Sequence, residues 1–143
     1  MTSSVFPDIN VWLALVLDRH KHNQLAMRWY DALDPRTIFL FCRHTQLGLL
    51  RLLSTGAVTE DEPMTLRECW NVYDEWFDAG QAILVNEPVD LEAYFRALTF
   101  DPIVAPKFWA DAYLAAFAQA ANLTLVTFDR ALASKAPNSL LLP

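Results

Sequence analysis

Short apolar runs alternate along this chain with longer segments in which apolar residues recur every three or four positions. The short runs, at residues 4–6, 38–41, 82–85 and 123–127, are typical of buried strands. The longer segments predict helices at residues 11–16, 23–33, 45–53, 65–79, 90–98 and 106–121. Strands that alternate with helices in this way predict an α/β fold with a parallel sheet of four to five strands.

Local signals fix several boundaries of these predicted helices. The segment Thr65-Leu-Arg-Glu68 matches a capping box, in which the Thr hydroxyl and the Glu carboxylate satisfy each other's free amides. Gly56 ends the third predicted helix, and Asn10 is expected to cap the helix that begins at Val11. The proline-bearing stretch 101–106 predicts a loop.

Composition places the chain among compact proteins with a substantial core. Its 143 residues are 54% apolar and include only three glycines, which fits one domain spanning residues 1–143. No apolar run approaches the roughly 18 to 20 residues that cross a bilayer, and no signal peptide is recognisable, so we expect a cytoplasmic protein. Cys42 and Cys69 are expected to be reduced, partly buried hydrophobic residues.

The net charge of −6 argues against a protein that binds nucleic acid by broad neutralisation of phosphates. Any contact with nucleic acid should therefore be local. An acidic pocket that gathers divalent cations remains compatible with this charge.

Three aspartates are predicted to lie at one edge of the sheet. Asp8 follows the first strand, Asp129 follows the last predicted strand, and Asp111 lies in the first turns of the helix between residues 106 and 121. Carboxyl ends of parallel strands share an edge, so the three carboxylates are expected to converge there. An aspartate in such a place also serves as a helix cap, but three together favour a site for magnesium or manganese. Asn10 and Thr127, each two residues from one of these aspartates, are supporting candidates.

The segments that carry these residues resemble the VapC-type PIN-domain ribonucleases. The resemblance rests on Asp8-Ile-Asn-Val-Trp-Leu-Ala-Leu, on Trp109-Ala-Asp111-Ala-Tyr-Leu-Ala-Ala and on Leu125-Val-Thr127-Phe-Asp129, in this order and spacing. It covers nearly all of residues 5–132. It implies a Rossmann-like PIN fold and a magnesium or manganese site formed by Asp8, Asp111 and Asp129. It also implies cleavage of RNA phosphodiester bonds that leaves a 5′-phosphate, a cognate protein antitoxin and a homodimer.

One position departs from the family pattern. PIN nucleases usually carry a Glu on the helix after the second strand, where this chain has Gln46. Gln46 shares a helix face with Leu50 and Leu53, so its side chain is expected to point inward near the site. A Gln carbonyl oxygen can bind a hard cation but carries no charge, which places metal affinity in question.

The basic side chains and histidines complete the candidate chemistry. Arg43, Arg51 and Arg130 are candidates for phosphate contact, each with a solvated surface role as the alternative. His20 and His22 are expected in a polar loop, and His44 at a helix start is expected to act as a cap or to face solvent.

Two further hypotheses concern partners and activity. Leu66, Trp70, Tyr73 and Phe77 form an apolar stripe that predicts a core face, and Val72 and Trp76 widen it enough to suggest a partner surface. A catalytically silent PIN domain that binds RNA or protein is the alternative to a nuclease. A phosphoacceptor receiver-like domain is disfavoured because no lysine stands at a strand end and no acidic pair follows the first strand.

Overall fold

A five-stranded parallel sheet forms the centre of the molecule in the computed structural model, which describes residues 3–143. The strands run in the order β3-β2-β1-β4-β5, all parallel to their neighbours. Their bounds are β1 Ser4–Pro7, β2 Ile38–Phe41, β3 Ala82–Leu84, β4 Leu125–Thr127 and β5 Ser139–Leu141. The predicted α/β class and strand number are confirmed.

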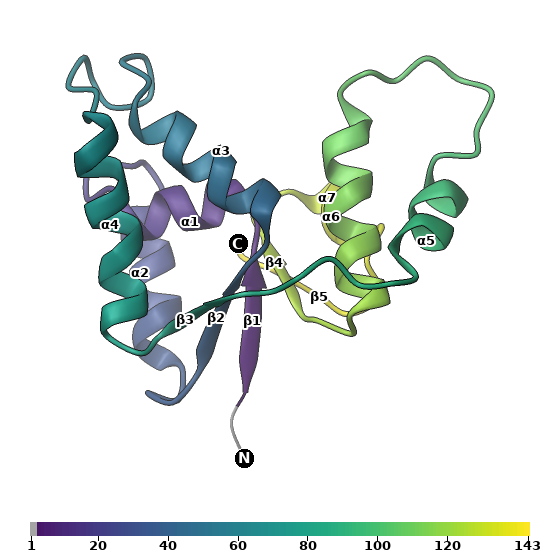
Figure 1. Cartoon of the computed structure of the whole chain (residues 1–143), viewed down its shortest axis with the longest axis horizontal. Helices are drawn as coiled ribbons and strands as arrows, with labels where there is room; N and C mark the ends of the chain where they lie inside the picture. The colour runs from purple at the N-terminus through teal and green to yellow at the C-terminus, as the bar shows by residue number, and fades with distance from the viewer. Residues whose placement is uncertain (1–2) are drawn as a thin grey trace.

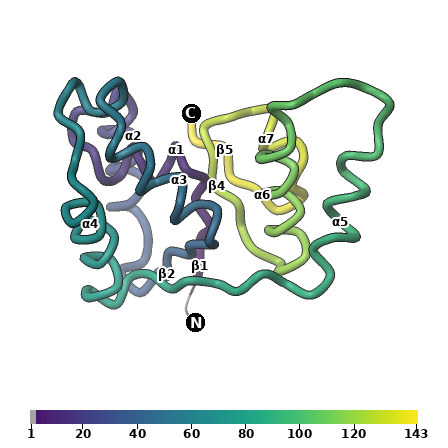
Figure 2. The backbone as a smooth tube through the Cα atoms, turned by 45° about the horizontal axis from the view of Figure 1, so that its top comes forward, coloured from purple at the N-terminus to yellow at the C-terminus, as the bar shows by residue number. Residues whose placement is uncertain are grey.

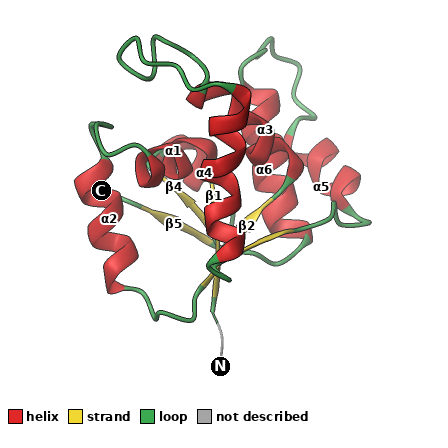
Figure 3. Cartoon of the chain, turned by 60° about the vertical axis from the view of Figure 1, so that its left-hand side comes forward, coloured by secondary structure: helices red, strands yellow, loops and turns green. Residues whose placement is uncertain are grey.

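Helices cover both faces of this sheet (Figures 1 and 3). Their bounds are α1 Ile9–Val16, α2 Asn23–Ala32, α3 Arg43–Leu53, α4 Leu66–Asp78, α5 Leu91–Leu98, α6 Phe108–Ala120 and α7 Arg130–Ala133. Helices α1 to α4 gather on one side, and α5 to α7 gather on the other (Figure 1). None of the helices within residues 3–143 is long and apolar enough to cross a membrane.

The strand order reverses next to β1, and this reversal determines where a ligand can bind. From β1 the chain proceeds to β2 and β3 on one side, and returns later to place β4 and β5 on the other. Phe6 of β1 lies opposite Leu125 of β4, and Ser4 lies opposite Ile38 of β2. In open parallel sheets the crevice at such a switch point, at the carboxyl ends of the strands, is where ligands bind.

Aromatic residues on alternate positions of the strands fill the two faces of the sheet. Trp12 of α1 stacks on Phe41 of β2 with ring centroids 3.8 Å apart. On the opposite face, Phe6 of β1 stacks on Phe117 of α6 at 5.3 Å. Each of these four side chains is fully buried, so aromatic packing joins β1 and β2 to helices on both faces of the sheet.

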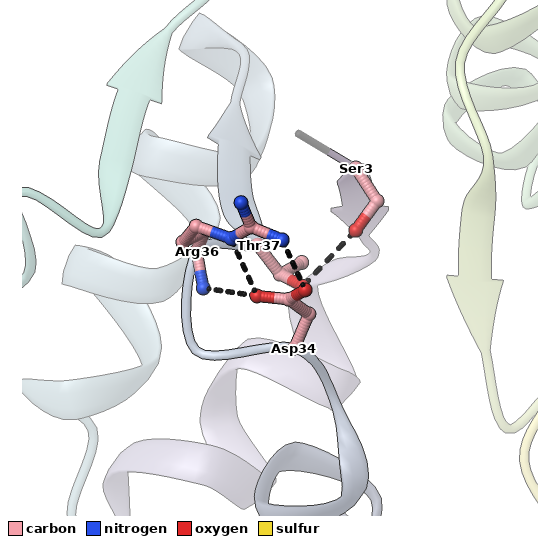
Figure 4. A network of polar contacts seen from close by, with 4 residues as sticks. All are labelled: Ser3, Asp34, Arg36 and Thr37. Atoms are coloured by element: carbon pink, nitrogen blue, oxygen red, sulfur yellow. Dashed lines mark hydrogen bonds and ion pairs between the residues drawn. The ribbon is translucent and has the colours of Figure 1, made fainter. Parts of the chain in front are cut away.

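The turn before β2 is closed by polar contacts (Figure 4). The Asp34 carboxylate accepts hydrogen bonds from the Arg36 backbone amide at 2.8 Å and from Arg36 Nη2 at 2.9 Å. The Ser3 and Thr37 hydroxyls lie 3.1 Å apart, at the amino ends of β1 and β2. These contacts hold the amino ends of β1 and β2 together, on the opposite side of the sheet from the carboxyl ends of the strands.

Several predicted boundaries need correction. Helix α1 begins at Ile9 with Asp8 as its cap, so Asn10 is an exposed residue of the first turn rather than the cap. Helix α3 begins at Arg43, ends at Leu53 and is capped by Ser54, not by Gly56. The capping box of Thr65 and Glu68 is confirmed. Strand β5 and the short helix α7 were not predicted.

The apolar stripe on α4 divides into an inner and an outer part. Tyr73 and Phe77 pack on the core, but Leu66 is 79% exposed and Trp70 is 46% exposed, so the prediction of a core stripe is wrong for these two. Trp76 packs at 90° against the Trp12 ring at 4.9 Å and therefore belongs to the core rather than to a partner surface. The two free cysteines, Cys42 and Cys69, are buried as predicted.

Candidate active site

Asp8 lies at the carboxyl end of β1 and is held by two hydrogen bonds. Its side chain is buried, and Oδ1 accepts a hydrogen bond from the Val11 amide at 2.9 Å, which caps α1. Oδ2 accepts a hydrogen bond from Thr127 Oγ1 of β4 at 2.5 Å. The switch point between β1 and β4 therefore fixes both oxygens of this carboxylate.

Burial raises the pKa of Asp8 from 3.8 to about 6. The hydrogen bonds from Thr127 and Val11 oppose this rise, whereas the negative charges of Asp111 and Asp129 add to it. The effect of those two charges on the Asp8 pKa means that the three carboxylates share one electrostatic environment.

Asp129 follows β4 and caps the short helix α7. Its Oδ1 accepts hydrogen bonds from the amides of Ala131 at 2.8 Å and Leu132 at 3.3 Å. Its own amide donates to Thr127 Oγ1 at 2.9 Å. Thr127 therefore connects the Asp8 carboxylate to the backbone of Asp129, and it does so with a fully buried side chain.

Asp111 approaches from α6, where it lies in the first turn. Burial raises its pKa, the Asp129 charge raises it further, and His44 opposes the rise. Asp111 on α6 therefore lies close enough to Asp129 and to His44 of α3 for their charges to change its pKa.

Carboxylate oxygens are the ligands that hard divalent cations prefer. Within residues 3–143 no group of three or more His, Cys, Asp or Glu side chains is close enough to chelate a metal ion by itself. The donor set nevertheless fits magnesium, which keeps several waters and needs only one or two direct carboxylates. Burial is the main reason why the pKa of Asp8 is raised, and the negative charges of Asp111 and Asp129 add a smaller increase that a bound cation would offset.

Gln46 points inward but already has a polar partner. The residue is buried in the first turns of α3, and its Oε1 accepts a hydrogen bond from Arg43 Nη1 at 2.7 Å. Burial raises the pKa of Tyr73 on α4, and the neighbouring Gln46 side chain opposes that rise. The amide thus lies between Arg43 and α4.

The arginines and Asn10 occupy exposed positions. Arg43 begins α3 and Arg130 begins α7 directly after Asp129. Arg51 lies in the last turn of α3, about 12 Å further along the helix axis than Arg43 at 1.5 Å per residue. Asn10 lies on the exposed side of the first turn of α1. Arg43 and Arg130 therefore border the carboxylates more directly than Arg51 does.

His44 belongs to this site, although the sequence suggested a cap or a solvent-exposed residue. Its half-buried ring meets the Tyr113 ring edge to face at 5.6 Å, and the Asp111 charge acts on it. Burial lowers the pKa of His44, and Asp111 opposes this change. His20 and His22 lie in the turn between α1 and α2, as predicted. No spacing in the sequence indicates the contact between His44 and Tyr113 of α6, because it depends on packing between two helices and joins residues that are 69 positions apart.

The chain belongs to the PIN-domain family, whose sequence pattern it matches over residues 5–137. It is 42% identical to Ribonuclease VapC41 of Mycobacterium tuberculosis over 128 residues, a match that covers 87% of this chain and 88% of the relative. Ribonuclease VapC29 of the same species is 29% identical over 133 residues, covering 91% and 89% of the two chains.

Solved structures share the fold at low sequence identity. The crystal structure of Mycobacterium tuberculosis VapC20, described as a Sarcin-Ricin loop cleaving toxin, superposes with a TM-score of 0.67 at 15% identity, covering 91% of this chain and 93% of that one. A VapBC2 structure from Rickettsia felis, bound to a DNA fragment from its promoter, gives a TM-score of 0.66 at 15% identity and covers 96% of both chains. The PIN fold predicted from the sequence is thereby confirmed.

Proposed function

We propose that this protein is a metal-dependent endoribonuclease and the toxin of a VapBC-type toxin-antitoxin pair. The observation that carries the proposal is the buried carboxylate of Asp8, whose pKa is raised to about 6 at the switch point of the sheet beside Asp111 and Asp129. The 42% identity to a VapC ribonuclease over most of the chain supports the activity. Perturbed carboxyl groups that converge in this way are typical of active sites.

The three aspartates would hold magnesium or manganese. When bound, such a cation activates a water molecule and stabilises negative charge on the leaving oxygen of a phosphodiester. Asp8 supplies a rigid ligand, because its two hydrogen bonds leave its carboxylate little freedom to rotate. Asp111 and Asp129 are less buried and can orient a water molecule toward the phosphate.

Basic side chains around the carboxylates would position the RNA. Arg130 adjoins Asp129, and its guanidinium is suited to contact a phosphate beside the cleaved bond. Arg51 would contact the RNA further from that bond, because it lies at the far end of α3. With a net charge of −6, binding should depend on these local contacts rather than on a broad basic surface.

A protein antitoxin and a second copy of this chain are the proposed partners. The VapBC2 structure and a toxin-antitoxin complex from Klebsiella pneumoniae are among the structures that share the fold. Large apolar side chains are exposed between α5 and α6 and at the start of α6, where a partner would shield them from water. They are Phe100, Ile103, Val104 and Trp109.

The alternative function is a catalytically silent PIN domain that binds RNA or protein. It is favoured by Gln46, which supplies no charge and whose carbonyl oxygen is bonded to Arg43. The two functions differ in what happens to bound RNA.

Incubation of the purified protein with labelled single-stranded RNA, in manganese, in magnesium and in EDTA, distinguishes them. The nuclease yields fragments with 5′-phosphate ends in the presence of either metal and none in EDTA. RNA that is bound but remains uncut in every metal would instead identify the silent domain.

A further inference from the structure

A small hollow opens between the end of β3, the start of α3 and the middle of α6. Its volume is about 90 Å³, which leaves room for several water molecules. Four polar and three apolar residues line it: Arg43, Asn86, Glu87 and Tyr113, with Leu84, Val85 and Phe117. One edge of a heterocyclic ring can enter such a hollow and reach these side chains.

The acceptor in this hollow is held in place by a tyrosine. Tyr113 donates a hydrogen bond from its hydroxyl to Glu87 Oε2 at 2.8 Å. Burial, with the Glu87 contact second, raises the pKa of Tyr113 far above its usual range, so the hydroxyl stays protonated and remains a donor. A carboxylate has about four acceptor sites, so Glu87 retains free acceptors.

Arg43 is the main hydrogen-bond donor in this hollow, and Gln46 holds its side chain in place. Arg43 Nη1 is bonded to Gln46 Oε1, which leaves the other guanidinium N–H groups available. In the described part of the chain Arg43 forms no ion pair, so its guanidinium and the Glu87 carboxylate line one hollow without pairing. A ligand with hydrogen-bond donors and acceptors on one edge could pair with both the Glu87 carboxylate and the Arg43 guanidinium. A phosphate group alone would be repelled by the negative charge of Glu87.

The hollow is next to the proposed catalytic centre. Arg43 lies one residue before His44, and Tyr113 lies two residues after Asp111 on α6. The His44 ring contacts Tyr113, which lines the hollow, and the Asp111 charge raises the pKa of the same ring. The segment after β3 crosses from the α4 side to the α5 side (Figure 2), and Asn86 and Glu87 belong to this segment.

We propose that this hollow is a base-recognition subsite that takes the Watson–Crick edge of a guanine next to the cleaved phosphodiester. The proposal rests on the proposed ribonuclease function. Guanine carries adjacent N1–H and N2–H donors, which match the two oxygens of the Glu87 carboxylate, and its O6 acceptor matches Arg43 or Asn86. Adenine, cytosine and uracil each lack such a pair of adjacent donors.

Glu87→Gln tests this subsite with little change to the fold, because a Gln carbonyl oxygen can still accept the Tyr113 hydrogen bond. Glu92→Gln is the matched control, since Glu92 is exposed on α5 and pairs with Arg96 there. One measurement is the base preference at the cut, obtained by sequencing the products of a randomised RNA pool in manganese. The other is the affinity, in EDTA, of labelled oligoadenylate heptamers that carry G, C, U or A at the central position.

The wild type should prefer guanine beside the cut and bind the guanine heptamer roughly tenfold more tightly than the others. Glu87→Gln should lose both preferences, and Glu92→Gln should keep them. Tyr113→Phe, which frees the Glu87 carboxylate, should weaken the preference and provides a second variant if Glu87→Gln is unstable.

Cleavage with no preference for guanine, or with one that survives Glu87→Gln, would overturn the subsite and leave the nuclease function intact. A guanine preference in EDTA without cleavage in any metal would overturn the nuclease function but support the subsite.

Discussion

Thr127 Oγ1 donates a hydrogen bond to Asp8 Oδ2 at 2.5 Å and joins two residues that are 119 positions apart in the sequence. The same hydroxyl accepts a hydrogen bond from the Asp129 amide. One buried side chain of β4, the strand next to β1, thus contacts two proposed metal ligands.

Thr127→Val should therefore weaken both the fold and the site. Loss of the buried hydroxyl leaves the Asp8 carboxylate without one partner, which should lower the free energy of unfolding by about 1–3 kcal/mol. The pKa of Asp8 should rise above about 6, because the Thr127 hydrogen bond lowers it. Urea unfolding and NMR titration of Asp8 measure the two effects. Thr124→Val is the control, since its hydroxyl takes only an exposed hydrogen bond of 3.3 Å, and equal losses in both variants would contradict this account.

The raised pKa of Asp8 makes the metal-free protein less stable as pH rises. Its folded pKa of about 6 exceeds the ordinary value of 3.8, so the folded state binds the proton more tightly. The resulting stabilisation is complete below about pH 4 and is lost as pH rises through about 6; it amounts to roughly 3 kcal/mol.

The free energy of unfolding of wild type and of Asp8→Asn is measured in EDTA from pH 4 to pH 8. The difference between them isolates the titration of Asp8, because both proteins keep His44 and Asp111. Asp8→Asn should gain stability relative to wild type across that range, and should be the more stable protein at pH 7.5. If the difference in unfolding free energy between the two proteins stays constant from pH 4 to pH 8, folding does not raise the pKa of Asp8 and this prediction is wrong.

Much of the fold follows from the sequence because it depends on local patterns. Thr65 and Glu68 define their helix start within four residues, and the strands are continuous apolar runs. Strand β5 escaped prediction because its three residues lie in a short tail between Pro137 and Pro143 and acquire strand structure only by pairing with β4. Helix α7, with four residues, is too short for a periodic signal.

The sequence indicates where the candidate carboxylates lie but not how closely they approach one another. Asp8 and Asp129 follow neighbouring parallel strands, which end together, but no three acidic side chains within residues 3–143 come close enough to chelate a metal ion by themselves. The sequence could not show that Asp8 rather than Asn10 caps α1, because both are good caps. The contacts of His44 with Tyr113, and of Gln46 with Arg43, depend on side-chain rotamers and on packing between helices.

Gln46→Glu should strengthen metal binding. A carboxylate at this position adds negative charge near the proposed site, and hard cations respond to the charge of their ligands. Part of that charge will be neutralised by Arg43, so we expect a gain of about 1–2 kcal/mol, or roughly tenfold in the manganese midpoint. Isothermal titration of manganese measures it, with the exposed Gln119→Glu as the control. Midpoints that match wild type would place Gln46 outside the metal site.

Gly48 allows α3 to approach α1 beside Asp8. A Cβ at this position would come within 2.2 Å of Ile9 Cδ1 and 2.8 Å of Ile9 Cγ1. Gly48→Ala should destabilise the protein by about 1–3 kcal/mol, despite the better helix propensity of Ala. Adding Ile9→Ala removes the clashing atoms, so the double variant should be less destabilised than the sum of the single variants. If the losses of unfolding free energy in the two single variants simply add in the double variant, Gly48→Ala does not act through a clash with Ile9 and this prediction is wrong.

The most direct test of the central claim is the initial rate of RNA cleavage in manganese by wild type, Asp8→Asn and Asp18→Asn at pH 7.5. Asp18 is an exposed aspartate just after α1, so it matches the charge change without touching the site. Asp8→Asn should lower the rate by at least about 100-fold, since removing a group that stabilises transition-state charge typically costs this much. It should do so while the variant remains folded and more stable than wild type in EDTA. Asp18→Asn should cleave at the wild-type rate. Equal cleavage by Asp8→Asn and wild type would contradict the assignment of the active site to the carboxylates at the switch point.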